Sequence, residues 1–160
     1  MNIELVTVDY NDAKQGQDLL MLLNAYALDP MGGGEPITEY VRENLLATLA
    51  KQNNVFSIIG YVDGKPAGLI NCVEGFSTFS CKPLVNIHDA VVLPEYRGKG
   101  LVDRLFNEVE SIAKDKGCCK VTLEVLEGNI VAQKAYKKFG YNGYELDPEM
   151  GKAIFWQKKL

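Results

Sequence analysis

A stretch that changes from a strand pattern to a helix pattern across two glycines constrains this fold most. Residues 84–93 are mostly apolar and end in Ala-Val-Val-Leu, which predicts a buried strand. Pro94 ends that strand, because proline has no N–H group to donate to a sheet. Gly98 and Gly100 follow, and apolar residues then recur every three to four positions through Ala113. The predicted order is therefore strand, glycine-rich turn and amphipathic helix.

The start of this helix is predicted to bind an anion. The first turn of a helix leaves about four backbone N–H groups unpaired and carries a partial positive charge. Glycines allow a ligand to approach the backbone closely, and Arg97 and Lys99 add two full positive charges. Together these features suit a phosphate or pyrophosphate. The alternative is an ordinary strand-to-helix connection with a charged turn exposed to solvent.

Two motifs in the second half of the chain resemble those of a known enzyme superfamily. Val92-x-Pro94-x-x-Arg97-Gly98-x-Gly100 resembles motif A of the GNAT superfamily of acetyl-CoA-dependent N-acyltransferases. The family's following motif B is similar to Asn129-x-x-Ala132-x-x-x-Tyr136-x-x-x-Gly140-Tyr141. The two motifs stand in the family's order and separation and cover roughly residues 84–141. The N-terminal third matches the family's layout only in outline.

The hydrophobic pattern predicts elements in the order βααβββαβαββ, within a single domain of residues 1–160. Asn11 or Asp12 is expected to cap the first helix, and Asp63-Gly64 to form a hairpin turn. The predicted strands cover residues 3–8, 55–62, 67–73, 84–93, 120–126, 141–146 and 153–157. The predicted helices run from residue 12 to about 29, from about 38 to 50, from 100 to 116 and from 130 to 139, with a loop at 75–83.

This order is the one that the resemblance implies for a GNAT fold of the α+β class. The family's central sheet is mixed and mostly antiparallel. Its two parallel strands, which flank the pivotal helix, splay apart, and acyl-CoA enters the cleft between them.

Composition narrows the possible partners. The formal charge of −4 and the pI near 5.1 argue against a nucleic-acid-binding protein, which usually has a basic balance. No apolar run approaches the roughly 20 residues of a membrane span, and no secretory signal is visible at residues 1–4. The four cysteines form no Cys-x-x-Cys pair and there is a single histidine, so no metal site is expected. Reduced, buried thiols in a cytoplasmic protein are the expectation.

The resemblance implies an N-acetyltransferase. Such an enzyme moves an acetyl group from acetyl-CoA to a primary amine of a small molecule, peptide or protein, by direct transfer through a tetrahedral intermediate. The CoA pyrophosphate would be held by the turn and the first helical residues, which are Arg97, Gly98, Lys99, Gly100, Leu101 and Val102. The pantetheine arm would pair with the strand backbone at Ala90, Val91 and Val92. Val102 stands where the family has a small residue, so its branched side chain is expected to crowd the phosphate.

Motif B supplies two further expected site residues. Tyr136 matches the family's tyrosine that protonates the departing thiolate and lies against the cofactor. A phenol with a pKa of about 10 suits that role, although Tyr136 shares a helix face with Ala132 and Phe139 and could be a core residue. Asn129 matches an asparagine that contacts the cofactor arm. Its position directly before a helix also predicts an N-cap.

Several residues could act as the base that deprotonates the amine. His88 carries an imidazole, a common general base, and by strand alternation it is expected on the face of Ala90 and Val92. It also resembles in position a histidine of the arylalkylamine N-acetyltransferases. Asp89, expected on the opposite face, and Glu124 on the neighbouring strand are alternatives. A water chain without a single base is a further possibility in this family.

The acceptor side is predicted by family analogy alone. Tyr26, Glu35, Phe76 and Phe79 could form an aromatic and acidic wall for a cation, or could be ordinary loop residues. The family also suggests a possible homodimer. Two other functions are alternatives: a CoA-binding sensor or interaction protein without turnover, and a nucleotide-binding oxidoreductase. The oxidoreductase motif lacks its third glycine here, where Asp103 stands.

Overall fold

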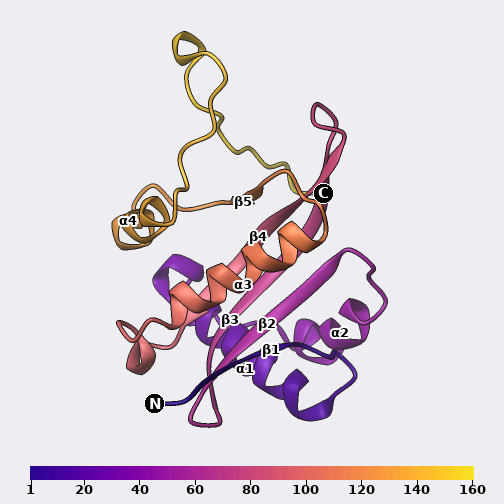
Figure 1. Cartoon of the computed structure of the whole chain (residues 1–160). Helices are drawn as coiled ribbons and strands as arrows, with labels where there is room; N and C mark the ends of the chain where they lie inside the picture. Colours follow the sequence, from indigo (N-terminus) through magenta and orange to yellow (C-terminus); the bar gives the residue numbers. More distant parts are fainter. The chain divides into compact units, whose positions relative to one another are not determined.

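Five strands form one mixed sheet in the computed structural model, which describes residues 1–160 (Figure 1). They lie in sequence order, with antiparallel pairing from β1 to β4 and parallel pairing between β4 and β5. The strands are β1 (Ile3–Thr7), β2 (Val55–Val62), β3 (Lys65–Ser77), β4 (Lys82–Val92) and β5 (Val121–Leu123). The sheet belongs to one unit, Met1–Glu124, and Val125–Leu160 forms a second unit.

Four α-helices accompany the sheet, as the sequence predicts. They are α1 (Ala13–Leu28), α2 (Glu39–Leu49), α3 (Leu101–Asp115) and α4 (Ile130–Lys138). Three short 3-10 helices are η1 (Pro30–Gly32), η2 (Pro94–Tyr96) and η3 (Pro148–Met150). No helix has both the length and the apolar content that a membrane span needs.

The first unit has two packed faces, one on each side of the sheet. α1 and α2 cover one face, where Leu19 and Leu22 are fully buried against Ile59 and Leu69. α3 covers the other face and contacts β2, β3 and β4 (Figure 1). The predicted hairpin turn is confirmed, because Asp63 and Gly64 have φ angles of 49° and 77°, as a type I′ turn requires.

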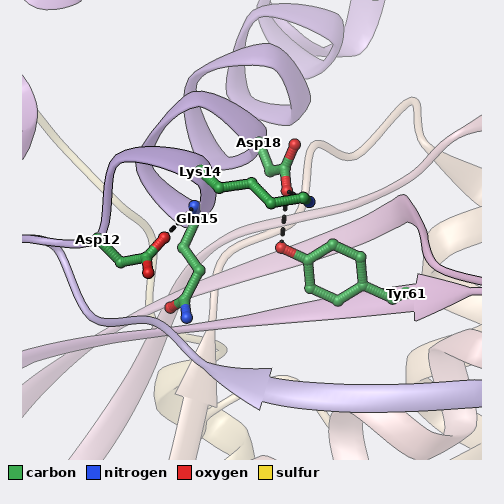
Figure 2. Close-up of polar contacts among 5 residues, drawn as sticks. All are labelled: Asp12, Lys14, Gln15, Asp18 and Tyr61. Atoms are coloured by element: carbon green, nitrogen blue, oxygen red, sulfur yellow. Dashed lines mark hydrogen bonds and ion pairs between the residues drawn. The ribbon is translucent and has the colours of Figure 1, made fainter.

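Local hydrogen bonds fix the N-terminal end of α1 against β2 (Figure 2). The side chain of Asp12 accepts from the N–H of Gln15 at 2.8 Å, which confirms Asp12 as the N-cap. One turn further on, the Tyr61 hydroxyl of β2 donates to Asp18 at 2.8 Å. Lys14 pairs with the same carboxylate at 2.7 Å (Figure 2). α1 therefore begins at a defined residue and in a defined position over the sheet.

The first turn of α3 approaches the sheet closely because two paired strand positions are glycine. A Cβ atom at Gly60 would lie 2.6 Å from Leu101 Cδ1. A Cβ atom at Gly68 would lie 3.1 Å from Leu105 Cδ1. Both leucines are 1% exposed. These contacts hold the start of α3 just beyond the end of β4, where the glycine-rich turn needs it.

The predicted loop at residues 75–83 is wrong in most of its length. β3 continues to Ser77 and β4 begins at Lys82, with Phe76 paired to Pro83. Gly75 and Pro83 are loop signals in a sequence, but the ladder continues past both of them. The long β3–β4 hairpin reverses at residues 78–81, with Cys81 at a φ of 49°.

The predicted C-terminal strand pair is also wrong. Residues 141–146 and 153–157 form a single antiparallel bridge, Glu145 to Lys152, and no strand. Every residue from Asn142 onward is exposed, so the pair buries no apolar face. An isolated two-stranded hairpin is marginal in water without such burial, which explains the difference.

All four cysteines are free thiols, and the prediction that they are buried is correct only for Cys72 in β3. Cys81 and Cys119 are exposed and Cys118 is half-buried. Cys81 lies in the hairpin tip and Cys119 in the connection to β5. Composition alone did not indicate that these two positions would be exposed.

Candidate active site

The edge of β4 is open where β4 and β5 part. β4 pairs with β5 only from Val85–Val121 to Ile87–Leu123. β4 nevertheless continues to Val92, and residues 89–92 pair with β3 alone. Such an edge presents backbone N–H and C=O groups to an extended ligand. The predicted parting of two parallel strands is therefore confirmed within the first unit.

A β-bulge marks the point where the strands part. Ile87 pairs with Cys72 and Asp89 pairs with Asn71, so His88 has no partner in the β3–β4 ladder. An extra residue of this kind bends its strand and increases the local twist. The bulge lies directly after the last β4–β5 pair and directly before the open edge.

The bulge also changes which face His88 occupies. Val92 pairs with Gly68, whose missing Cβ would point at α3, so Ala90 and Val92 face α3. The ring of His88 instead lies near Asn86, with Nδ1 3.5 Å from Oδ1, and is exposed. The prediction that His88 shares a face with Ala90 and Val92 is wrong, because the extra residue interrupts the alternation.

The glycine-rich turn ends in a helix start without a side-chain cap. Gly98 and Gly100 have φ angles of 71° and 79°, a left-handed conformation that favours glycine. Gly100 is the N-cap of α3 and provides no side-chain acceptor for the first turn. A Cβ atom at either glycine would meet nothing within 4 Å. The mouth of α3 is thus open, and the N–H groups of its first turn lack helical partners.

Two cations flank this mouth, and both are tied to the chain just before it. Arg97 donates from Nε to the carbonyl of Val92 at 2.9 Å, which leaves its two terminal nitrogens available. Lys99 donates from Nζ to the carbonyl of Glu95 at 2.8 Å and lies over the ring of Tyr96. Arg97 is therefore fixed at the end of β4, whereas Lys99 folds back over η2.

Leu101 and Val102 have different surroundings in the first turn of α3. Leu101 is 1% exposed and packs on the sheet, so only its backbone can serve a ligand. Val102 is half-buried, and its branched side chain stands in the turn that would face a phosphate. The expectation that Val102 crowds the phosphate stays a prediction.

Asp89 lies on the face that α1 covers. Its Oδ2 accepts from Nδ2 of Asn71 at 3.1 Å. Burial raises the pKa of the nearby Tyr26 phenol, and the Asp89 and Asp29 carboxylates add to the increase. Tyr26 therefore stays protonated at neutral pH and can donate a hydrogen bond. None of the three ion pairs of the chain involves Asp89, so its charge has no cationic partner.

In the second unit, three local contacts hold the motif B residues. Oδ1 of Asn129 accepts from the N–H of Ala132 at 3.2 Å, which confirms the predicted N-cap of α4. The half-buried ring of Tyr136 packs edge-on against Tyr141, with centroids 6.3 Å apart. Gly140, with a φ of 93°, allows the N–H of Tyr141 to bond to the carbonyl of Tyr136 at 3.0 Å.

The other expected acceptor and base residues are spread along the first unit. Glu124 is exposed directly after β5, and Glu35 is exposed between η1 and α2. Phe76 is 61% exposed and Phe79, at the hairpin tip, is 95% exposed. Phe76 pairs with β4 six positions before Asp89, about 20 Å along the strand. The structure thus brings Tyr26 to Asp89 and leaves the two phenylalanines far from it.

Four residues that help to build the site were missed by sequence reasoning. Gly60 and Gly68 allow Leu101 to approach the sheet, and Ser57 and Asn71 form a polar line that ends at Asp89. Signals for them were present in the sequence. Glycine inside a strand indicates a close backbone approach, and a polar residue inside an apolar strand needs a buried partner.

Comparison with known proteins gives the family of this chain. Residues 19–141 match the family model described as Acetyltransferase (GNAT) family. That match covers more than half of the chain and includes the bulged strand, the glycine-rich turn and both motifs. The chain belongs to the GNAT family of acetyltransferases, which use acetyl-CoA.

Particular relatives are similar over part of the chain. It is 37% identical over 83 residues to thialysine N-epsilon-acetyltransferase of Bos taurus, with 48% of each chain covered. It is 33% identical over 94 residues to glucosamine 6-phosphate N-acetyltransferase 1 of Dictyostelium discoideum, with 56% of this chain and 58% of that protein covered. The aligned stretch thus spans about half the length of these curated relatives.

A solved structure is similar over the whole chain. The aminoglycoside N-acetyltransferase AAC(6')-Iy, in complex with the bisubstrate analogue CoA-S-monomethyl-acetylneamine, has a TM-score of 0.76 and covers 100% of both chains. Its sequence is 18% identical. At that identity the likeness shows a common fold.

Proposed function

We propose that this protein is an N-acetyltransferase that moves an acetyl group from acetyl-CoA to a primary amine. One observation carries the proposal. The free edge of β4 at residues 89–92 lies beside the uncapped, open start of α3. A long ligand with a strand-like amide arm and an anionic end matches both features at once. Membership of the GNAT family supports the same reading.

The cradle residues fit the cofactor's anionic linker. Backbone N–H groups from Gly98 to Val102 would hold the pyrophosphate, because nothing fills the Cβ positions of Gly98 and Gly100. The free terminal nitrogens of Arg97 would add charge beside it. The backbone of residues 90–92 would pair with the pantetheine amides. When bound, acetyl-CoA supplies the activated acetyl thioester.

Two side chains are proposed for the proton transfers. Asp89 would accept the proton that the amine loses, because it is half-buried and has no cationic partner of its own. Tyr136 of the second unit would donate a proton to the departing thiolate. His88 and Glu124, both exposed, are the alternative bases. An ion pair between Asp89 and a protein cation would have counted against this role, because that cation would compete with the amine for the carboxylate.

The acceptor is proposed to be cationic before it reacts. The surroundings of Tyr26 are acidic, because the carboxylates of Asp89 and Asp29 lie near its phenol. The protonated hydroxyl of Tyr26 adds one hydrogen-bond donor. A protonated primary amine would gain a charge partner there. Either a small molecule or a peptide terminus carries such a group.

The cradle is tested by calorimetry with CoA on Gly100→Asp. Aspartate tolerates the left-handed conformation and is a good N-cap, so its carboxylate should occupy the N–H groups that the phosphate needs. Helix stability should be kept while CoA binding is lost. Gly117→Asp is the matched control, since Gly117 ends the same helix with a φ of 74° and equally open space. Equal CoA affinity of the two variants would remove the cradle.

The reaction is tested by release of CoA with a panel of primary amines. Turnover that depends on both acetyl-CoA and amine supports the proposal. CoA binding without turnover of any amine would instead indicate a CoA-binding sensor. Absence of CoA binding in the unaltered protein would refute the proposal completely.

A further inference from the structure

A line of hydrogen bonds crosses three adjacent strands and ends at Asp89. The Tyr10 hydroxyl lies 2.8 Å from Oγ of Ser57 in β2. Ser57 donates from Oγ to Oδ1 of Asn71 in β3 at 2.6 Å. Asn71 donates from Nδ2 to Oδ2 of Asp89 in β4 at 3.1 Å. The sheet register makes this possible, because Ser57, Asn71 and Asp89 are successive cross-strand partners.

The direction of this line is fixed by the chemistry of its members. Ser57 has one hydroxyl proton and gives it to Asn71, so it must accept from Tyr10. Burial, the largest cause, raises the pKa of the Tyr10 phenol, while the bond to Ser57 acts in the opposite direction. Tyr10 therefore keeps the proton that it donates. Asn71 is held at both ends, which prevents its amide from rotating.

The His88 bulge brings the last member into this line. Ile87 faces α3, since it pairs with Cys72, the position after Asn71 in β3. If His88 were paired in a regular ladder, strand alternation would place Asp89 on the same face as Ile87. Because His88 is bulged out of the ladder, Asp89 faces α1 and reaches Asn71. One local irregularity therefore joins the open strand edge and the polar line.

We propose that Asn71 and Ser57, with Tyr10 behind them, are positioning residues that hold the Asp89 carboxylate toward the ammonium group of the acceptor. This inference rests on the proposed function and deepens it. Oδ2 is fixed by Asn71, while Oδ1 accepts no hydrogen bond within the chain and is left for the amine. Ser57 is 1% exposed, so water does not compete for the middle of the line.

Fixing the carboxylate has a chemical purpose. A partly buried carboxylate loses some of its water and needs a fixed donor in exchange. The amide of Asn71 supplies that donor without adding charge, so the attraction of Asp89 for a cation remains intact. A carboxylate held in one orientation also avoids the ordering cost at the moment of proton transfer.

The line itself is tested by NMR of the Asn71 side-chain amide. In the unaltered protein one Nδ2 proton should resonate downfield, as expected of a proton donated to a carboxylate. Asp89→Ala should move that resonance upfield, and Ser57→Ala should speed rotation of the amide. Unchanged spectra in both variants would overturn the proposal, because the line would not exist in solution.

The positioning role is tested by a double-mutant cycle on amine turnover. Asn71→Leu should lower kcat about tenfold and leave the KM for acetyl-CoA within about twofold. In an Asp89→Asn background the same change should cost less than about twofold, because its target is already lost. Equal losses in both backgrounds would overturn the proposal, since they would indicate a structural effect alone.

Further variants separate positioning from stability and from the proposed function. Ser57→Ala and Tyr10→Phe are small changes, and they should lower kcat by progressively less than Asn71→Leu. Cys72→Ala is the control, since Cys72 is the buried neighbour of Asn71 on the other face and should reduce stability without reducing kcat. A kcat loss with Cys72→Ala that matches Asn71→Leu would count against the proposal. Absence of turnover in the unaltered protein would overturn both proposals.

Discussion

Replacing Gly60 by alanine should move the helix mouth, although Gly60 itself is no part of the proposed cofactor site. A Cβ atom at Gly60 would lie 2.6 Å from Cδ1 of Leu101, the first residue of α3. Carbon atoms in ordinary contact are about 3.5–4.0 Å apart, so Leu101 must move by roughly 1 Å. Leu101 is 1% exposed, so its side chain is enclosed by its neighbours. We expect the backbone of the first turn to shift together with the side chain.

The size of the effect follows from packing and hydrogen-bond energies. Overpacking a core costs about 1–3 kcal/mol, and 2 kcal/mol lowers the Tm of a chain of this length by roughly 4–8 °C. A 1 Å shift is enough to break one N–H contact to a phosphate. A charge-assisted hydrogen bond is worth about 1.5–3 kcal/mol, so CoA affinity should fall roughly 10- to 100-fold.

Thermal unfolding and calorimetry with CoA measure both effects on the same protein. Gly75→Ala is the matched control, because a Cβ there would meet only Leu84 at 3.3 Å on an exposed stretch of β3. Shortening Leu101 to valine in the Gly60→Ala background should restore part of the affinity. A Gly60→Ala protein with lowered Tm but unchanged CoA affinity would refute the link between this packing and the cradle.

Two further predictions concern single side chains. Tyr136→Phe should lower kcat at least about tenfold while CoA affinity stays unchanged, and a normal kcat would exclude the proposed thiolate acid. Burial raises the pKa of the Cys72 thiol to about 12, and its side chain is 1% exposed. At pH 8, where Cys72 remains a neutral thiol, iodoacetamide should modify exposed Cys81 and spare Cys72 until denaturant is added, as mass spectrometry would show.

The elements that local patterns specify were predictable from sequence. Strand, proline, two glycines and an amphipathic helix each carry a local signal, and the structure has them at residues 82–115. The Asp12 cap and the Asp63-Gly64 turn depend on neighbouring residues only, so they too were correct. The family motifs then gave the parting of β4 and β5, which no local pattern contains.

Features that depend on partners distant in sequence were not predictable in the same way. The bulge at His88 exists only in the register between β3 and β4, so alternation along β4 gave the wrong face. The line from Ser57 to Asp89 needs three strands in register, and no spacing within one strand encodes it. Residues 141–157 carry a strand pattern, but they bury no apolar face in the structure.

The bulge at His88 both bends β4 away from β5 and accompanies the placement of Asp89 on the α1 face. Deleting His88 should remove the bend and keep the placement. Ile87 and Asp89 would become neighbours and keep their partners Cys72 and Asn71, so every later side chain of β4 stays on its present face. The variant should therefore fold. The bend that accompanies the bulge would be lost, and β4 could then pair with β5 beyond Leu123, which narrows the gap proposed for the pantetheine arm.

CoA affinity should accordingly fall in the deletion variant and stay unchanged in His88→Ala, which removes the imidazole but keeps the extra residue. Calorimetry with CoA distinguishes the two, and circular dichroism checks that both are folded. The physical reason is that a bulge depends on residue count, whereas an exposed ring contributes little to the strand. If the deletion variant bound CoA as tightly as His88→Ala does, the parting of β4 and β5 would have to arise from another cause, such as the sequence of β5 itself.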